Sequence, residues 1–103
     1  MQTAGAAIRS RFPTRVPIVL AADEDGNQSE KFLAPEDMSI REFSSVIRTR
    51  MLLPAEKALF IFIDTANEHV LPPSHSLLRE LYTQHKADDE CLHMTFTGEN
   101  TFG

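Results

Sequence analysis

The residues of this 103-residue chain that could do chemistry are few: one cysteine, four histidines and a glycine at the last position. Cys91 and His93 are two positions apart, which on a strand puts them on one face. His69, His75 and His85 fall in other segments without metal-ligand spacing, so we expect no metal or other cofactor. The sequence places no base beside Cys91, so we expect a small packed side chain rather than a nucleophile, and no enzyme.

The final glycine, Gly103, offers a different chemistry, which is acyl transfer at its carboxyl carbon. Because glycine has no Cβ, a nucleophile reaches its carbonyl easily, and its free φ and ψ let a tail enter a narrow channel. Such chemistry also needs a nucleophile and a base. Taken alone, however, a glycine at this position favours an ordinary chain end.

Composition and charge exclude several classes of protein. The formal net charge is −5, and an acidic chain does not seek phosphate backbones, so we expect no nucleic-acid partner. A single cysteine excludes an internal disulfide. The first five residues lack a signal-peptide layout, and the longest apolar run, 58–63, is too short to span a bilayer. We therefore expect a cytoplasmic protein.

The front half of the chain predicts a helix, a hairpin and a second helix. An alanine-rich segment over 4–12 predicts a short helix that Pro13 ends. Apolar, β-branched residues predict strands over 16–21 and 30–34, with turn chemistry between them. Ser39 and Glu42 form a capping box that opens a helix over 39–52. Its apolar stripe consists of Ile40, Phe43, Ile47 and Met51.

The rear half predicts three strands and a third helix. The apolar run over 58–64 predicts a central strand buried on both faces, and 70–71 a short return strand. Ser74 or Ser76 is expected to cap a helix over 76–86. Residues 91–97 alternate as a strand does, and 98–103 show no periodicity.

This order of elements resembles the ubiquitin-like β-grasp, an α+β fold, with an extra helix at the front. We therefore expect a mixed four-stranded sheet with helices over 39–52 and 76–86 and a short N-terminal helix. The expected organisation is a helical extension over 1–13, a ubiquitin-like domain over 14–97 and a flexible conjugation tail over 98–103.

Several segments, in the same order, resemble the autophagy-type ubiquitin-like modifiers of the GABARAP kind, and together they cover nearly everything from Ile8 onward. The segments are Arg11-Phe12-Pro13-Thr14-Arg15-Val16-Pro17-Ile18-Val19, Phe32-Leu33-Ala34-Pro35, Val46-Ile47-Arg48-Thr49-Arg50, Leu53-Pro54-Ala55-Glu56-Lys57-Ala58-Leu59-Phe60-Ile61-Phe62, Val70-Leu71-Pro72-Pro73, Leu81-Tyr82 and Gly98-Glu99-Asn100-Thr101-Phe102-Gly103. Each segment is weak evidence alone, and the ordered set is specific.

The resemblance implies a modifier that is conjugated through the carboxylate of Gly103. Its implied partners are an adenylating enzyme, thioester-carrying conjugation enzymes and a processing or deconjugating cysteine protease. The implied end product is an amide with phosphatidylethanolamine in the autophagosomal membrane. There the modifier would recruit cargo receptors and machinery that carry a short aromatic-x-x-aliphatic motif.

The resemblance also implies a peptide-binding site on the edge strand 31–35, where a partner peptide adds as a further strand. The implied aromatic pocket is lined by Ile8, Pro17, Lys31, Leu33 and Cys91. The implied aliphatic pocket is lined by Phe32, Pro35, Met38, Phe43 and Val46, with Arg50 near its rim. From helical spacing alone, Phe43 fits the core, whereas Val46 and Arg50 fit a groove wall.

Two departures from the family bear on that site. About seven residues precede the Ile8 helix where relatives carry two helices, which implies that the first helix, with the acidic residues flanking the aromatic pocket, is absent. Relatives have a large aromatic side chain where this chain has Cys91, so we expect a deeper or wider pocket and altered peptide selectivity. Two alternatives stay open: a ubiquitin-like modifier conjugated to a protein lysine, and an unconjugated peptide-binding adaptor.

Overall fold

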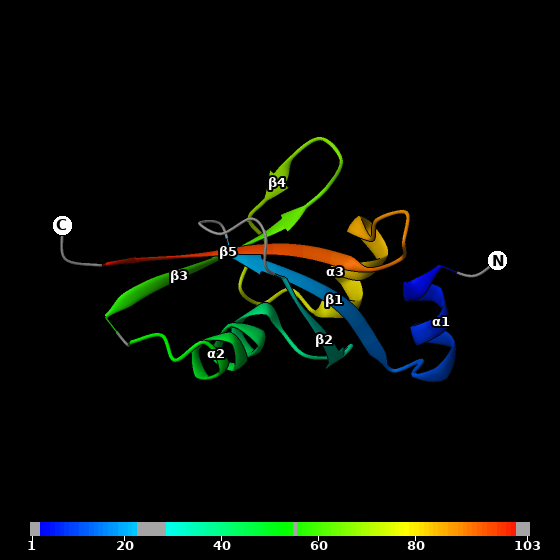
Figure 1. The fold of residues 1–103 in the computed structure, drawn as a ribbon, viewed down its shortest axis with the longest axis horizontal. Helices are drawn as coiled ribbons and strands as arrows, with labels where there is room; N and C mark the ends of the chain where they lie inside the picture. The colour runs from blue at the N-terminus through cyan, green and yellow to red at the C-terminus, as the bar shows by residue number, and fades with distance from the viewer. Residues whose placement is uncertain (1–2, 23–28, 55, 101–103) are drawn as a thin grey trace.

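The computed structural model describes residues 3–22, 29–54 and 56–100, which form three helices and a five-stranded sheet. The elements are α1 (Ala4–Arg11), β1 (Arg15–Ala22), β2 (Ser29–Pro35), α2 (Ile40–Arg50), β3 (Lys57–Asp64), β4 (His69–Val70), α3 (Leu78–His85) and β5 (Leu92–Asn100) (Figure 1). The strand order is β2-β1-β5-β3-β4, in which β1 and β5 run parallel and the other neighbours antiparallel. This arrangement confirms the expected ubiquitin-like β-grasp.

The sheet has five strands rather than the four expected, because the short return strand predicted over 70–71 also joins it. The fifth, β4, is two residues long and pairs with the end of β3 through Ile63↔Val70 and Asp64↔His69. It lies one residue earlier than the predicted return strand over 70–71, because its pairing starts directly after the turn that Thr65 and Glu68 close.

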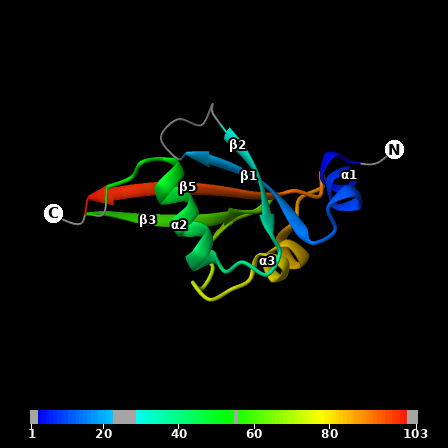
Figure 2. The same cartoon turned by 90° about the horizontal axis from the view of Figure 1, so that it is seen from below.

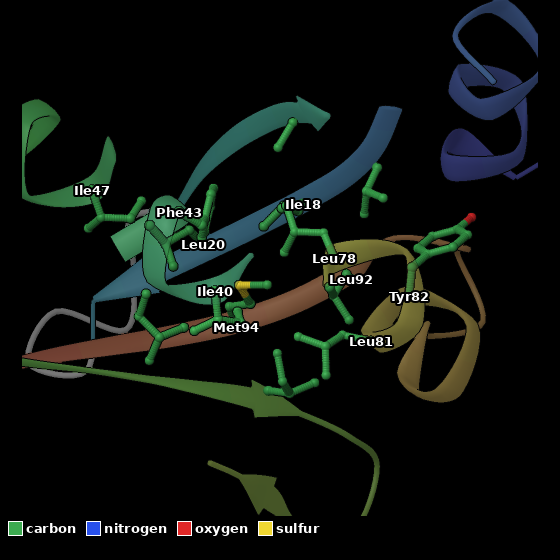
Figure 3. Packing of buried hydrophobic residues seen from close by; sticks show 14 residues of the cluster. Ile18, Leu20, Ile40, Phe43, Ile47, Leu78, Leu81, Tyr82, Leu92 and Met94 are labelled. Atoms are coloured by element: carbon green, nitrogen blue, oxygen red, sulfur yellow. The ribbon is translucent and has the colours of Figure 1, made fainter. Parts of the chain in front are cut away.

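The core lies between one face of the sheet and the helices α2 and α3 (Figure 3). From α2, the predicted stripe supplies Ile40, Phe43 and Ile47, all buried, and Met51 packs against them. The buried residues that the sheet and α3 contribute are Val16, Ile18, Leu20, Ala34, Ile61, Ile63, Leu78, Leu81, Tyr82, Leu92 and Met94. Burial of this apolar set is the main source of the fold's stability.

The helices α2 and α3 are capped at their N-termini in different ways. At α2, the predicted capping box is present: Ser39 Oγ accepts from the Glu42 N–H, and the Ser39 N–H donates to Glu42 Oε1, both at 3.1 Å. At α3, neither Ser74 nor Ser76 is the N-cap, so that expectation was wrong; Leu77 is. The first N–H groups of α3 instead donate to main-chain carbonyls of the segment before α2, at 2.8 Å for Leu78 to Met38. Glu80 Oε1 also accepts locally, from the Leu77 N–H at 3.0 Å, but the carbonyl supplied from 40 residues away leaves no local sequence signal.

The strand β3 is not buried on both faces, which corrects the prediction for 58–64. Ile61 and Ile63 are buried, whereas the alternating residue Phe60 is 38% exposed. The central strand is β5, and β3 lies beside it toward one edge of the sheet. No helix covers the second face at β3 in the described chain, because α2 and α3 both pack on the core face.

The strand β5 continues into the segment predicted as a loose tail. Gly98, Glu99 and Asn100 pair with Leu59, Ala58 and Lys57 of β3. The expected boundary at residue 98 is therefore corrected to a point after residue 100, since backbone pairing with β3 orders residues that lack apolar alternation. Thr101, Phe102 and Gly103 lie outside the described residues.

The helix α1 occupies the end of the sheet opposite to the end of β5, as two views agree (Figure 1, Figure 2). It begins with Thr3 as N-cap, whose Oγ1 accepts from the Ala6 N–H at 3.1 Å. The predicted helix over 4–12 is confirmed to within one residue, as Phe12 is its C-cap. α1 thus adjoins the loop that leads from α3 into β5.

Candidate peptide-binding site

The strand β2 forms an edge of the sheet, since among the described strands it pairs only with β1. An edge strand of this kind can accept an extended peptide through its main-chain groups. Its side chains alternate between the two faces of the sheet. Phe32 packs against the core, while Lys31 is exposed and Leu33 is half-buried on the other face. The alternation therefore places the two predicted pockets on opposite sides of one strand.

The residues predicted to line the aromatic pocket, called the aromatic group below, lie on the face of the sheet away from the core. The register pairs Pro17 with Leu33 and Val19 with Lys31, so Pro17, Leu33 and Lys31 share that face. Pro17 is buried, and Cys91, one step before the β1–β5 pair Ile18↔Leu92, is 6% exposed. The structure thus brings four of the five predicted residues together.

The fifth residue of the aromatic group, Ile8, comes from α1 and is half-buried. It lies one turn after Gly5, the buried residue by which α1 contacts the loop before Cys91. Residues three apart share a helix face, so Ile8 and Gly5 are on the same side of α1. The position of Ile8 relative to the sheet therefore depends on how α1 docks.

The thiol of Cys91 is a poor nucleophile in this setting. Burial raises its pKa above the ordinary value, the charge of Asp89 raises it further, and the charge of Lys31 opposes the shift. A thiol with a raised pKa carries little thiolate near neutral pH. This electrostatic setting favours the simple interpretation of Cys91 as a packed wall residue.

Asp89, which the sequence analysis did not single out, and His93 lie beside Cys91 at the base of this wall. Asp89 accepts hydrogen bonds from the Cys91 N–H at 3.0 Å and pairs with His93 Nε2 at 2.8 Å. Burial raises the pKa of Asp89, but the bonds from Cys91 and His93 outweigh it, so the pKa lies below the usual value. Aspartate is a common turn residue, and its place just before β5 is the only local sign of this role.

The residues predicted to line the aliphatic pocket, called the aliphatic group below, lie on the core side of β2. The Phe32 and Phe43 rings meet edge to face, with centroids 5.6 Å apart, and Met38, like Phe32, packs against the core. Phe43 is only 1% exposed, so it supports the group from below rather than lining a surface. Pro35 closes β2 and is half-buried, and its carbonyl accepts from the Met38 N–H at 3.1 Å. The spacing argument for Phe43 as a core residue agrees with its burial.

The helix α2 supplies the exposed part of the aliphatic group. Val46 is 39% exposed, and a shallow hollow of about 510 Å³ is lined by Ser45, Val46, Thr49 and Arg50. Arg50 connects this hollow to β2, because its guanidinium lies 5.3 Å from the Phe32 ring centroid and its Nε is 2.9 Å from Glu30 Oε2. Phe32, Pro35, Met38 and Phe43 do not line the hollow, so the six predicted residues form a floor and a wall rather than one cavity.

Two kinds of feature, a metal-binding cluster and a membrane-spanning helix, are not found in the described part of the chain. Within residues 3–22, 29–54 and 56–100, no three His, Cys, Asp or Glu side chains are arranged to hold a metal ion. Over the same part of the chain, none of the helices combines the length and apolar character needed to cross a bilayer.

Comparison with known proteins decides the family. A family model described as the autophagy protein Atg8, ubiquitin-like, matches residues 1–103. This chain belongs to the Atg8 family. It is 39% identical over 106 residues to autophagy-related protein 8 of Schizosaccharomyces pombe, covering 99% of this chain and 84% of that protein. It is 40% identical over 100 residues to autophagy-related protein 8b of Arabidopsis thaliana, covering 93% and 79%.

A solved structure of the Atg8 family shares the fold. The crystal structure of Trypanosoma brucei ATG8 superposes with a TM-score of 0.75 at 35% sequence identity, over 96% of this chain and 85% of that one. The expected recognition as an autophagy-related, ubiquitin-like protein is therefore confirmed. Gly103 lies outside the described residues, so its proposed chemistry rests on the Atg8-family sequence rather than on geometry.

Proposed function

We propose that this Atg8-family protein is a lipid-conjugated adaptor that binds aromatic-x-x-aliphatic peptides along β2. The observation that carries the peptide part is the open β2 edge with Lys31 and Leu33 on one face and Phe32 on the other. A peptide added as a strand alternates its side chains in the same way. Its residues three positions apart therefore point to opposite faces of the sheet. The aromatic and aliphatic side chains of the motif therefore reach the two sides of β2.

The two sides of the edge suit the two side chains. The aromatic group offers a Pro17 and Leu33 surface beside a buried thiol, with the Lys31 ammonium exposed at its border. The aliphatic group offers Val46 and the Phe32 ring, bordered by the charged Arg50. Apolar anchors ringed by polar groups are the usual anatomy of such small interfaces.

We propose that conjugation occurs at Gly103 and that partner enzymes do the chemistry, so the chain itself is not an enzyme. The carboxylate attacks the α-phosphate of ATP, which releases pyrophosphate and forms an acyl adenylate, and a partner cysteine thiolate then attacks the acyl carbonyl and releases AMP to give a thioester. The amine of phosphatidylethanolamine then attacks the thioester carbonyl, forming an amide and releasing the thiol. A cysteine protease would process the precursor or hydrolyse the product.

A lipid amide would explain how this chain reaches a membrane. At about 0.8 kcal/mol per buried CH₂, the two acyl chains of one lipid hold a protein stably, where one chain is marginal. The proposed locations are the cytoplasm before conjugation and the autophagosomal membrane afterwards. Conjugation to a protein lysine and a free adaptor remain the alternatives, and mass spectrometry of the cellular form separates the three.

Peptide binding is tested by calorimetric titration with a motif peptide and with a copy in which both anchor residues are alanine. Val46→Ala should weaken binding of the motif peptide several-fold, because Val46 lines the hollow on α2. Arg41→Ala is the matched control, since Arg41 is exposed on the first turn of the same helix and lies outside that hollow. Equal affinity for the motif peptide and its alanine copy would refute the proposed site.

A further inference from the structure

The helix α1 docks on the loop before β5 by a contact that only glycine permits. The Gly5 N–H donates to the Asp89 carbonyl at 2.9 Å. A Cβ at Gly5 would lie 2.1 Å from the Glu90 carbonyl oxygen and 2.5 Å from that of Asp89. Both obstacles are main-chain atoms, which cannot swing aside as a flexible side chain can.

Glu90, the residue that faces Gly5, is held in an unfavourable conformation. Its φ is 59°, in the left-handed region that side-chain-bearing residues avoid. Three neighbours hold it there: Thr3 Oγ1 donates to Glu90 Oε2 at 3.0 Å, Tyr82 OH donates to the Glu90 carbonyl at 2.8 Å, and Lys86 Nζ is 3.5 Å from Oε1. One of these contacts comes from the N-cap of α1, so docking of α1 helps to maintain the strained backbone.

This strained residue stands directly before the aromatic pocket. Cys91 follows Glu90, and its N–H is fixed by Asp89 Oδ1 at 3.0 Å. Ile8, the other pocket residue outside the sheet strands, shares the docked side of α1 with Gly5. Two of the five proposed aromatic-pocket residues are therefore positioned by one contact region.

We propose that Gly5, Thr3 and Glu90 form a latch that completes the aromatic pocket, so that α1 docking and binding of the motif's aromatic side chain are coupled. The inference rests on the proposed function, since it concerns the same peptide site. If the pocket is complete only when α1 is docked, the apparent dissociation constant rises as the docked fraction falls. By linkage, a bound peptide must equally favour the docked helix.

The test compares Gly5→Ala with Ser10→Ala. Both substitutions raise helix propensity within α1, but only the first introduces a Cβ at the contact, since Ser10 is exposed. At Gly5, the higher helix propensity would stabilise α1, whereas the added Cβ would weaken its docking. The two effects can therefore be told apart by their sign. Thr3→Val is a milder second variant, which removes both the bond to Glu90 and the N-cap bond from the Ala6 N–H without adding a steric clash. It retains the latch test if Gly5→Ala fails to fold.

Two readouts follow the latch without any peptide. Cys91 is the only cysteine, so its rate of reaction with a thiol reagent such as dithionitrobenzoate reports exposure of the pocket wall. Gly5 is the second residue of α1, where the helix offers its N–H no acceptor, so slow exchange of that amide reports its bond to Asp89. We expect Gly5→Ala to speed Cys91 labelling at least tenfold, Thr3→Val to speed it less, and Ser10→Ala to match the wild type.

Peptide titration then tests the coupling. We expect Gly5→Ala to weaken binding of the motif peptide at least fivefold, while a peptide whose aromatic residue is alanine loses little further affinity. Peptide should also slow exchange of the Gly5 amide in the wild type. Faster labelling with unchanged affinity would overturn the coupling, and unchanged labelling would overturn the latch. If the wild type binds no motif peptide, the proposed function fails together with the coupling, while labelling still decides the latch.

Discussion

Replacing Leu52 by glycine should stabilise the protein, although it deletes a large side chain. Leu52 follows the C-cap of α2 with φ of 54° and is 88% exposed. The Leu53 N–H donates to the Arg48 carbonyl at 3.0 Å and the Leu52 N–H to the Thr49 carbonyl at 3.4 Å. This is the Schellman arrangement, in which the left-handed position usually carries glycine.

The expected gain follows from two opposing terms. A left-handed conformation costs a side-chain-bearing residue roughly 1–2 kcal/mol. Glycine also increases the conformational entropy of the unfolded chain, which offsets about 0.4–1 kcal/mol of the strain energy removed. Little burial is lost because the side chain is exposed, so the net stabilisation is about 0.5–1 kcal/mol, or roughly 2–8 °C in Tm.

The assay is urea denaturation followed by circular dichroism, with Leu71→Gly as the matched control. Leu71 is also exposed, at 58%, but its backbone is not left-handed. Glycine there should destabilise the protein by about 0.5–1 kcal/mol. If Leu52→Gly destabilises it to the same extent, the left-handed strain at Leu52 is refuted.

Three further predictions concern the site. Phe43→Ala should cost about 3–5 kcal/mol in denaturation, whereas Val46→Ala should cost under ~1 kcal/mol, because Phe43 is core and Val46 is surface; similar costs would contradict that division. Cys91→Phe should fill the aromatic pocket and change the preference between tryptophan and smaller aromatic anchors roughly tenfold in titrations, and identical affinities across the peptide series would sink this idea. Ionised Asp89, whose pKa is lowered, contributes stability that is present above its ordinary pKa of 3.8 and lost as pH falls through its lower folded value. The stability difference between wild type and Asp89→Asn should therefore shrink below pH 3.8, and a difference that is constant with pH would contradict the assignment.

Local patterns predicted the parts of the fold whose causes are local. The Ser39–Glu42 capping box needs only four consecutive residues, and it is present with both hydrogen bonds. The α2 stripe and the alternation of Leu92, Met94 and Phe96 follow from helix and strand periods, and these residues belong to or pack against the core. Periodicity succeeds where one face of an element is buried.

The errors came from contacts between distant segments. The cap of α3 is a carbonyl at Met38, and the order of residues 98–100 comes from pairing with β3. Nothing within either segment encodes these partners. The apolar run in β3 suggested two buried faces, yet its second face is partly open, since only the strand order decides what covers it.

The same distinction holds at the site. Family resemblance supplied the eleven pocket residues, and the structure separates them into a face with Leu33 and a face with Phe32. The roles of Asp89 and Glu90 depend on bonds from His93, Tyr82 and α1. Neither residue was singled out from the sequence, because a strained residue is recognised only with its neighbours in place.

Mass spectrometry of the chain recovered from autophagy-induced cell membranes tests the central claim most directly. The account predicts a terminal peptide in which the Gly103 carboxyl is joined by an amide bond to phosphatidylethanolamine, and predicts that Gly103→Ala abolishes this species and the membrane-bound pool. A Gly103 peptide branched onto a protein lysine, or a membrane-bound pool that survives Gly103→Ala unmodified, would contradict it.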